Sequence, residues 1–258
     1  MILKCLASGS SGNCYVLKDS AGKMLILDAG IPWKEIQIGI GFRPIDVEAV
    51  CITHSHSDHA RAVRDLNKVG IRTILPWESE NAHRGFYTVK PFPLTDSTGR
   101  FVHTNQDGSS CPVYGFLVEH PEMGRMVYLT DCEFCKWKFK RINHILVECN
   151  YDRELINPNA PNSEHVYRGH MELSTAVDFI RANASGDLQN IMLCHVGGNL
   201  DPDVAIKRVV EGVPNINPKT IIVERGKNYV LSSYVTGNND HGHRKRADFD
   251  SRSSGNRS

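Results

Sequence analysis

Long hydrophobic runs and a strong charge of one sign are both missing from this sequence. No apolar run approaches the roughly 20 residues needed to span a bilayer, and Lys4 and the Ser/Gly-rich residues 8–12 interrupt the apolar core that a signal peptide needs. The formal net charge of the 258 residues is only +1, so any nucleic-acid binding must come from a local basic patch. We expect a cytoplasmic protein without membrane contact.

A disulfide framework is also absent, although the chain has eight cysteines. They are scattered, and several lie in apolar stretches, which is typical of reduced, buried cysteines in a cytosolic protein. Cys132 and Cys135 form the only C-x-x-C pair. Since no second pair accompanies it, we favour buried thiols there over a structural zinc or redox site.

Two common catalytic devices are missing as well. The loop from Gly9 to Gly12 lacks the Gly-Lys-Ser/Thr ending of a nucleotide-binding P-loop. No Ser/His/Asp arrangement stands out as a nucleophilic triad. The chemistry must therefore come from other residues.

Short apolar or β-branched stretches, separated by Gly, Ser and Asp, predict strands over 2–7, 14–18, 24–27, 50–53, 86–89, 114–119, 126–129, 144–148 and 191–194. Apolar residues spaced by three predict a helix over 60–69 that ends at Gly70. Further helices are predicted over 174–184 and 203–213, and residues 220–224 and 229–231 predict a closing hairpin. We expect one layered α/β (α+β) domain over 1–235 and a polar, disordered tail over 236–258.

Residues 53–59 read Thr-His-Ser-His-Ser-Asp-His and follow a buried strand. Neutral imidazole and carboxylate are ligands of divalent transition metals. Alternate residues of an extended segment share one side, so His54 and His56 can hold one metal. The turn after them brings Asp58 and His59 to a second metal. Surface histidines in a polar loop are the alternative interpretation, which this dense cluster disfavours.

Two further strands end in a potential ligand. Residues 126–131 end in Asp131, and residues 191–195 end in His195. The carboxyl ends of strands form the edge at which α/β sheets place their sites. An aspartate can bridge two cations, and Asp131 is the natural bridge.

These motifs, taken together, resemble those of the metallo-β-lactamase-fold hydrolases. The opening Leu-Ala-Ser-Gly-Ser-Ser-Gly-Asn over 6–13 resembles the YycJ/WalJ-type branch, which is related to ribonuclease Z-type phosphodiesterases. The resemblance covers roughly residues 1–232 and includes Leu-Asp-Ala-Gly at 27–30. It implies a four-layer αβ/βα sandwich with two divalent ions at its rim, zinc first, with manganese or iron as alternatives. It also implies that Asp28 buttresses the histidine loop.

One metal ligand that the resemblance implies is not obvious in this chain. Relatives carry a further histidine just before the strand that here spans 114–118. An alignment from that strand puts Gln106 and Asp107 at this place, whereas His103 is the nearest histidine. A glutamine carbonyl is a poor zinc ligand, so we favour His103, with Asp107 as the alternative.

A further histidine lies in residues 168–174, Arg-Gly-His-Met-Glu-Leu-Ser, which also resemble the nuclease-like branch. The resemblance implies that His170 does not bind metal but stabilises the phosphate or protonates the leaving group. A histidine that simply packs at a helix entry is the alternative. Glu148 and the residues up to Asp152 match an acidic stretch of the family, to which we assign a supporting role.

The resemblance predicts a dinuclear metal-dependent hydrolase in which a metal-bridging hydroxide, oriented by Asp58, attacks a phosphodiester. The substrate is expected to be a nucleic acid or a linear or cyclic nucleotide. Basic residues could form a nucleic-acid track if they share one face; they are Arg61, Arg64, Lys68, Arg72, Lys136, Lys138, Lys140 and Arg141.

Two rival functions stay open. A thioester or lactone hydrolase on the same scaffold is favoured by an open apolar pocket without converging Arg or Lys. A regulatory binding protein with a degenerate metal site is favoured if the third ligand of the first metal is missing. The sequence does not fix the oligomeric state, and a homodimer is compatible with it.

Overall fold

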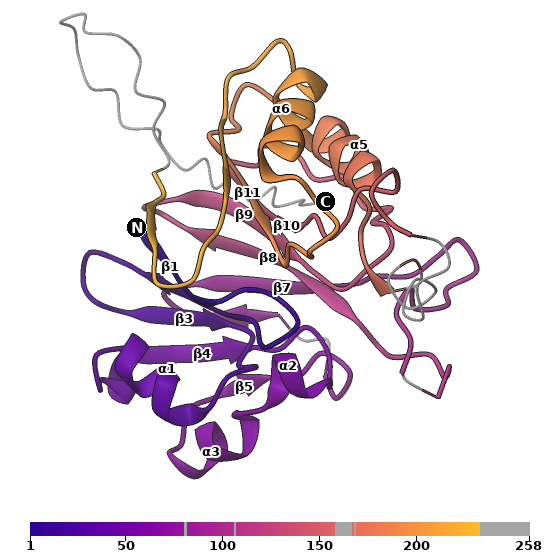
Figure 1. The fold of residues 1–258 in the computed structure, drawn as a ribbon. Coiled ribbons are helices and arrows are strands. Elements are labelled where there is room, and N and C mark those ends of the chain that lie inside the picture. The colour runs from indigo at the N-terminus through magenta and orange to yellow at the C-terminus, as the bar shows by residue number, and fades with distance from the viewer. Residues whose placement is uncertain (80–81, 106, 158–166, 168, 233–258) are drawn as a thin grey trace, which may run out of the picture.

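The computed structural model describes residues 1–79, 82–105, 107–157, 167 and 169–232. Within these ranges two sheets face each other, and helices lie on the outer side of each sheet (Figure 1). This arrangement confirms the expected four-layer αβ/βα sandwich in a single domain. The expected tail over 236–258 and the boundary at 235 lie outside the described residues.

The first sheet has six strands in the order β13-β1-β2-β3-β4-β5. Their bounds are β1 (Ile2–Ala7), β2 (Cys14–Lys18), β3 (Met24–Leu27), β4 (Val47–Cys51), β5 (Thr73–Ile74) and β13 (Asn228–Val230). β3 and β4 run parallel, with Leu27 beside Cys51. The residues that follow these two strands therefore emerge at the same edge of the sheet.

The second sheet has seven strands in the order β12-β11-β10-β9-β8-β7-β6. Their bounds are β6 (His83–Arg84), β7 (Thr88–Pro93), β8 (Tyr114–His120), β9 (Gly124–Leu129), β10 (His144–Glu148), β11 (Asn190–Cys194) and β12 (Lys219–Ile222). β9 to β12 are mutually parallel, so their carboxyl ends meet at one edge.

The helices belong to two groups. On the side of the first sheet lie α1 (Trp33–Gly39), the 3-10 helix η1 (Pro44–Asp46), α2 (Ser57–Ala60) and α3 (Val63–Lys68). On the side of the second sheet lie α5 (Leu173–Asn183) and α6 (Pro202–Gly212). Glu172 caps α5 and Asp201 caps α6, each by accepting hydrogen bonds from backbone N–H groups of the first turn.

Three apolar layers separate the four structural layers. In β3, Leu25 points between the sheets, whereas Ile26 packs beneath α1 and α3. In β10, Leu146 points between the sheets, whereas Ile145 packs beneath α5 and α6. This alternation follows from the two-residue period of a strand, and it explains why both strands are buried on both faces.

The predicted closing hairpin is wrong. β12 pairs in parallel with β11 in the second sheet, whereas β13 pairs antiparallel with β1 in the first. The chain therefore crosses from one sheet to the other between Ile222 and Asn228. β12 forms its backbone hydrogen bonds at the edge of the second sheet, and β13 forms its own at the edge of the first sheet.

Two other predicted elements are shifted. The helix expected over 60–69 is divided into α2 and α3, because the N–H of Ala62 donates to the carbonyl of Ala29 instead of continuing one helix. The strand expected over 86–89 begins only at Thr88, and Phe86 is 62% exposed in the turn before it. The short helix α1 and the two-residue strands β5 and β6 were not predicted.

Candidate metal centre

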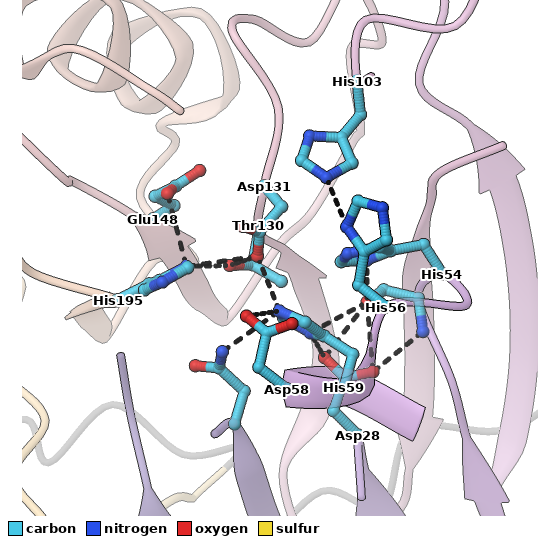
Figure 2. A network of polar contacts seen from close by, with 12 residues as sticks. Asp28, His54, His56, Asp58, His59, His103, Thr130, Asp131, Glu148 and His195 are labelled. Atoms are coloured by element: carbon cyan, nitrogen blue, oxygen red, sulfur yellow. Dashed lines mark hydrogen bonds and ion pairs between the residues drawn. The ribbon is translucent and has the colours of Figure 1, made fainter. Parts of the chain in front are cut away.

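Polar side chains at or just beyond the carboxyl ends of five strands gather at one place (Figure 2). They are Asp28 after β3, His54 after β4, Asp131 after β9, Glu148 at the end of β10 and His195 after β11. Asp28, Asp131 and His195 have left-handed φ angles of 57°, 50° and 49°. Such backbone conformations are uncommon outside glycine and are often found at functional sites.

Asp28 is completely buried and holds the histidine loop in place. Its carboxylate accepts hydrogen bonds from the backbone N–H of Thr53 at 2.8 Å and from the hydroxyl of Tyr128 at 2.6 Å. Its Oδ2 also lies 2.8 Å from Nδ1 of His59. With Nδ1–H directed at this carboxylate, Nε2 is the nitrogen of His59 that would bind a metal, on loss of its proton.

The first group of candidate ligands consists of His54, His56 and His103, which offer ring nitrogens within 4.8 Å of one another. Nδ1 of His56 and Nε2 of His103 are 3.1 Å apart, as expected for two nitrogens that share a zinc ion at about 2.0–2.1 Å. Burial lowers the pKa of His54 and lowers that of His103 to about 4. Both imidazoles are therefore neutral at physiological pH, which is the form that binds metal.

His103 lies against the histidine motif, and Asp107 does not join its ligand group. Asp107 is exposed, and its carboxylate accepts two hydrogen bonds within its own turn. Gln106 lies outside the described residues. Oδ1 of Asn105 is 2.9 Å from Nε2 of His56 and so helps to fix that ring with Nδ1 towards His103. The geometry therefore favours His103 for the position that the sequence left open.

The second group surrounds the carboxylate of Asp131, which is 3% exposed. Its Oδ2 lies 2.9 Å from Nε2 of His59 and 3.1 Å from Nδ1 of His195. Burial opposes ionisation of Asp131, but His195 and His59 hold its pKa well below the ordinary value. Burial also disfavours the charged form of His59, yet Asp131 and Asp28 raise its pKa well above the ordinary value. Ligand atoms of Asp131, His54 and His59 also lie within 4.8 Å of one another, so Asp131 adjoins both groups, and its bridging role stays a prediction.

Glu148 and His170 adjoin this second group. Oε1 of the buried Glu148 is 2.7 Å from Nδ1 of His170 and 3.4 Å from Nδ1 of His195. Burial lowers the pKa of His170, but Glu148 outweighs it and raises the value to about 9. Ligand atoms of these three residues and of Asp131 all lie within 4.8 Å of one another. The geometry thus allows a metal-binding role for His170 as well as the non-ligand role that we predicted.

Asp58 lies at the rim of the centre. Its side chain is 30% exposed, and its Oδ2 is 3.5 Å from Nε2 of His59. Burial raises the pKa of Asp58, but His59 outweighs this effect and lowers it below the ordinary value. Asp58 is therefore ionised and faces the pocket, although it belongs to none of the tightest ligand groups among the described residues.

The donor set fits a pair of divalent ions. Nε2 of His54 and Nε2 of His195 are buried and have no hydrogen-bond partner within the described part of the chain. A buried polar atom without a partner costs free energy, and a bound cation would remove that cost. Imidazole nitrogens with a shared carboxylate are the ligands that zinc and related transition metals prefer.

The centre opens into a pocket of about 610 Å³. Its lining consists of Ser10, His56, Ser57, Asp58, His103, Thr104, Asn105, Asp107, Asp131, His170 and His195. This lining is polar and, among the described residues, includes neither Arg nor Lys. The lining therefore lacks the apolar surface expected of a thioester or lactone hydrolase, but the absence of Arg and Lys among its described residues agrees with that expectation.

The sequence profile of the metallo-β-lactamase superfamily matches residues 7–145, which include Asp28, the histidine motif and Asp131. The chain belongs to this superfamily. Exodeoxyribonuclease WalJ of Streptococcus pneumoniae is 48% identical over 173 residues, covering 58% of this chain and 63% of the relative. The match therefore spans less than two thirds of that curated relative. It confirms the resemblance to the WalJ-type branch.

Solved structures share this fold. The metallo-β-lactamase fold protein YhfI from Bacillus subtilis has a TM-score of 0.61 at 14% identity, and the match covers 88% of this chain and 98% of that chain. The short form of human tRNase Z has a TM-score of 0.56 at 14% identity, with coverage of 90% and 98%. At these identities the likeness concerns the fold alone.

The cysteines and the helices were also the subject of expectations from the sequence. All eight cysteines are free, and only Cys135 is more than marginally accessible. Cys132 and Cys135 are not part of any ligand group found among the described residues. No helix within the described ranges is long and apolar enough to cross a bilayer.

Sequence reasoning missed several residues that support the site, among them Tyr128 and Asn13. The hydroxyl of Tyr128 donates to Asp28, and Nδ2 of Asn13 lies 3.1 Å from Nε2 of His59. Asn13 was noted only as the end of the opening motif. A tyrosine within the otherwise aliphatic strand 126–129 was the available signal for Tyr128, because a buried hydroxyl needs a polar partner.

Proposed function

We propose that this protein is a dinuclear metal-dependent phosphodiesterase that acts as a nuclease, with DNA as its main substrate. The observation that carries the proposal is that Asp131 belongs to two clusters of potential metal ligands in an open polar pocket, one with His54 and His59 and the other with Glu148, His170 and His195. The choice of DNA rests on the 48% identity with a protein named exodeoxyribonuclease. The predominance of imidazole favours zinc, with manganese or iron as alternatives.

The two groups have separate tasks in this proposal. The proposed ligands are His54, His56 and His103 for one ion, Asp58, His59 and His195 for the other, and Asp131 for both. When bound, such ions lower the pKa of a water molecule and neutralise charge on a phosphate. Asp58 is suited to orient the attacking oxygen, because it is ionised and partly exposed towards the pocket.

We assign the protonation of the leaving oxygen to His170. Nδ1 of this histidine is directed at Glu148, so Nε2 is the atom that delivers the proton to a substrate. The Glu148 carboxylate favours the protonated ring, and without metal it outweighs burial and raises the pKa of His170 to about 9. A positioned acid of this kind contributes about 10²- to 10⁴-fold to the rate.

The rival functions receive less support. The polar pocket lining disfavours a thioester or lactone substrate, which would require apolar surface around its acyl chain. The degenerate-site alternative depended on a missing third ligand, whereas His103 lies 3.1 Å from His56. Hydrolysis of a cyclic nucleotide would use the same chemistry as hydrolysis of DNA. The substrate panel described below distinguishes these two substrates.

We also propose that the protein works in the cytoplasm. Eight free cysteines are what a reducing compartment allows. Localisation of a fluorescent fusion in living cells tests this proposal, and a fusion found outside the cytoplasm would contradict it.

The proposed activity is tested with the purified protein and a panel of substrates. End-labelled single-stranded DNA, duplex DNA, RNA, a cyclic nucleotide and bis(p-nitrophenyl) phosphate are assayed with added zinc or manganese, beside thioester and lactone substrates. We expect hydrolysis of the phosphodiesters, fastest for DNA, and its loss in the Asp131→Asn variant. Hydrolysis confined to thioesters or lactones, or activity that survives in Asp131→Asn, would overturn the proposal.

A further inference from the structure

Residues 132–141 leave the metal centre and alternate aromatic with basic side chains, in the order Cys-Glu-Phe-Cys-Lys-Trp-Lys-Phe-Lys-Arg. The segment forms neither helix nor strand. Phe139 packs against the apolar layer beneath α5 and α6. Phe134 and Trp137, in contrast, leave 36% and 39% of their surface exposed. Partly exposed aromatic rings interleaved with basic side chains are the arrangement with which proteins bind single-stranded nucleic acid.

The segment is fixed in this conformation by hydrogen bonds. Nε1 of Trp137 donates to the carbonyl of Pro93 at 2.7 Å. Nζ of Lys136 donates to Oγ1 of Thr95 and to the carbonyl of Asp96, both at 2.8 Å. Because the indole of Trp137 is already held, a base that stacks on this ring loses little affinity to ordering.

The segment is also linked directly to the metal centre. The N–H of Cys132 donates to Oε2 of Glu148 at 3.2 Å, and Oε1 of the same carboxylate contacts His170. Three residues of extended chain span at most about 11 Å, so Cα of Phe134 lies within that distance of Cα of Asp131. A strand bound at the catalytic pocket can therefore continue onto the segment.

We propose that residues 134–141 form a binding track for single-stranded nucleic acid, a proposal that rests on the proposed nuclease function. Bases stack on Phe134 and Trp137, and the exposed basic residues Lys138, Lys140 and Arg141 neutralise phosphates. The described lining of the pocket contains no Arg or Lys, and the net charge is only +1. A polyanionic substrate therefore needs such a local source of positive charge.

The other basic candidates do not belong to this track. Arg61, Arg64 and Lys68 lie on α2 and α3 or between them, and α3 packs through Leu66 on the outer face of the first sheet. Residues 132–141 pack on the outer face of the second sheet. Ion pairing does not distinguish the two groups, because Nζ of Lys68 lies 3.0 Å from Asp65 and Nε of Arg141 lies 3.9 Å from Asp187. The basic residues singled out in the sequence thus occupy two layers, and only one group is interleaved with exposed aromatic rings.

Stacking on exposed rings selects for unpaired bases, because bases in a duplex are already stacked on one another. The protein has three tryptophans, so replacing Trp33 and Trp77 by Phe leaves Trp137 as the only indole. With metal removed by chelator, we expect single-stranded oligonucleotides to quench this fluorescence and duplexes of the same length to bind more weakly. Unchanged Trp137 emission at saturating single strand would overturn the proposal.

Variants of the track test the roles of the individual residues. We expect Phe134→Ala and Trp137→Ala each to weaken single-strand binding by about 5- to 100-fold. Lys138→Gln should reduce the dependence of log K on log salt by about 0.7. Phe86→Ala removes a ring that is 62% exposed on the β6–β7 turn and serves as the matched control. Equal losses in Phe86→Ala and Trp137→Ala, or no loss in either track variant, would overturn the track.

Hydrolysis of bis(p-nitrophenyl) phosphate distinguishes a failure of the track proposal from a failure of the proposed function. This small diester needs the metal centre but not the track, so the folded track variants should keep its wild-type kcat/KM while their KM for single-stranded DNA rises. If the wild type fails on the small diester and on DNA, the phosphodiesterase proposal is wrong. If the wild type is active and the track variants keep the wild-type KM for DNA, the track alone is wrong.

Discussion

At the scale of single residues, the centre depends on the groups that orient its histidines. Asp28 faces Nδ1 of His59, Asn105 faces Nε2 of His56, and Oγ1 of Thr53 lies 3.1 Å from Nδ1 of His54. In each case one ring nitrogen is engaged and the other points into the site. Such partners fix both the tautomer and the ring orientation of a ligand.

Asp28 provides the sharpest test of this arrangement. An Asp28→Asn side chain keeps the size but loses the charge. Its NH₂ group would face N–H or O–H groups from which Asp28 now accepts hydrogen bonds. We expect metal affinity to fall by about 10- to 100-fold, measured by competition with a chromophoric chelator. Tyr128→Phe removes only one donor to the same carboxylate and should have a smaller effect. Equal effects of the two variants would contradict the orienting role.

His170 tests the division between ligands and catalytic groups. We expect His170→Ala to keep nearly the full metal content and to lower turnover of phosphodiesters by about 10²- to 10⁴-fold. His103→Ala is the comparison, because it should lose one metal ion per chain. Metal analysis by mass spectrometry and turnover are measured on the same samples. Loss of metal from His170→Ala would instead place this residue among the ligands, as its distance of 3.4 Å from Asp131 allows.

At the scale of elements, the connection after β3 and the helix α2 are held together by their backbones. The N–H of Ala29 donates to the carbonyl of His59 at 2.7 Å, and the N–H of Asn13 donates to the carbonyl of Asp58 at 2.8 Å. An added Cβ at Gly30 would lie 1.6 Å from that Asp58 carbonyl oxygen. The glycine of the Leu-Asp-Ala-Gly motif is therefore required by this close approach.

Gly30→Ala should accordingly push α2 away and displace Asp58 and His59. We expect the free energy of unfolding to fall by about 3 kcal/mol or more, because the neighbouring atom is backbone and cannot move aside. Denaturant unfolding followed by circular dichroism measures this loss. Gly186→Ala meets open space and should change stability by less than about 0.5 kcal/mol. Similar stability of the two variants would refute the close-approach argument.

The elements also show where sequence reasoning succeeds. The short apolar stretch over 144–148 predicted β10 with its bounds, and the ranges predicted for α5 and α6 are correct within one residue, because buried elements require apolar residues. The pairing of β12 and β13 could not be predicted in this way. Strand partners are chosen by distant edges rather than by neighbouring residues, so two strands close in sequence joined different sheets.

The candidate site shows the same division. The candidate ligands were recognisable, because His, Asp and His at strand ends are chemically unusual, and the family resemblance indicated the supporting role of Asp28. The other supports were not recognisable, because Thr53, Asn105 and Tyr128 are ordinary polar residues whose role depends on three-dimensional contacts. The left-handed backbone of Asp131 and His195 is likewise a property of the folded chain and has no marker in the sequence.

At the scale of the whole molecule, the candidate metal centre joins the two sheets. His54 follows a strand of the first sheet, whereas Asp131 and His195 follow strands of the second. Metal that binds only the folded arrangement should stabilise the protein by about 2.7 kcal/mol at a free concentration of 100 times its Kd. We therefore expect a chelator to lower the Tm, measured by scanning calorimetry. A Tm that does not respond to the chelator in metal-loaded protein would argue against a site shared by the sheets.

Acid stability depends on a histidine at the opposite end of β10 from the metal centre. His144 is completely buried at the start of β10, and its Nδ1 lies 2.9 Å from Nδ2 of Asn190. Burial lowers the pKa of His144 from 6.5 to about 4. Between these pH values the unfolded chain binds a proton at this position and the folded protein does not. The free energy of unfolding therefore falls as the pH decreases through this window.

The variant His144→Gln has no titratable group at this position. Comparison with the wild type therefore isolates the contribution of His144 to the pH dependence of stability. The stability advantage of the wild type over His144→Gln at pH 7 should shrink as the pH is lowered, by up to roughly 3 kcal/mol near pH 4, because each unit of pKa shift corresponds to about 1.36 kcal/mol. Both proteins are unfolded by urea in the presence of chelator, so that metal release contributes to neither curve. A difference between the two proteins that stays constant from pH 7 to pH 4 would show that His144 is protonated in the folded state as readily as in the unfolded chain.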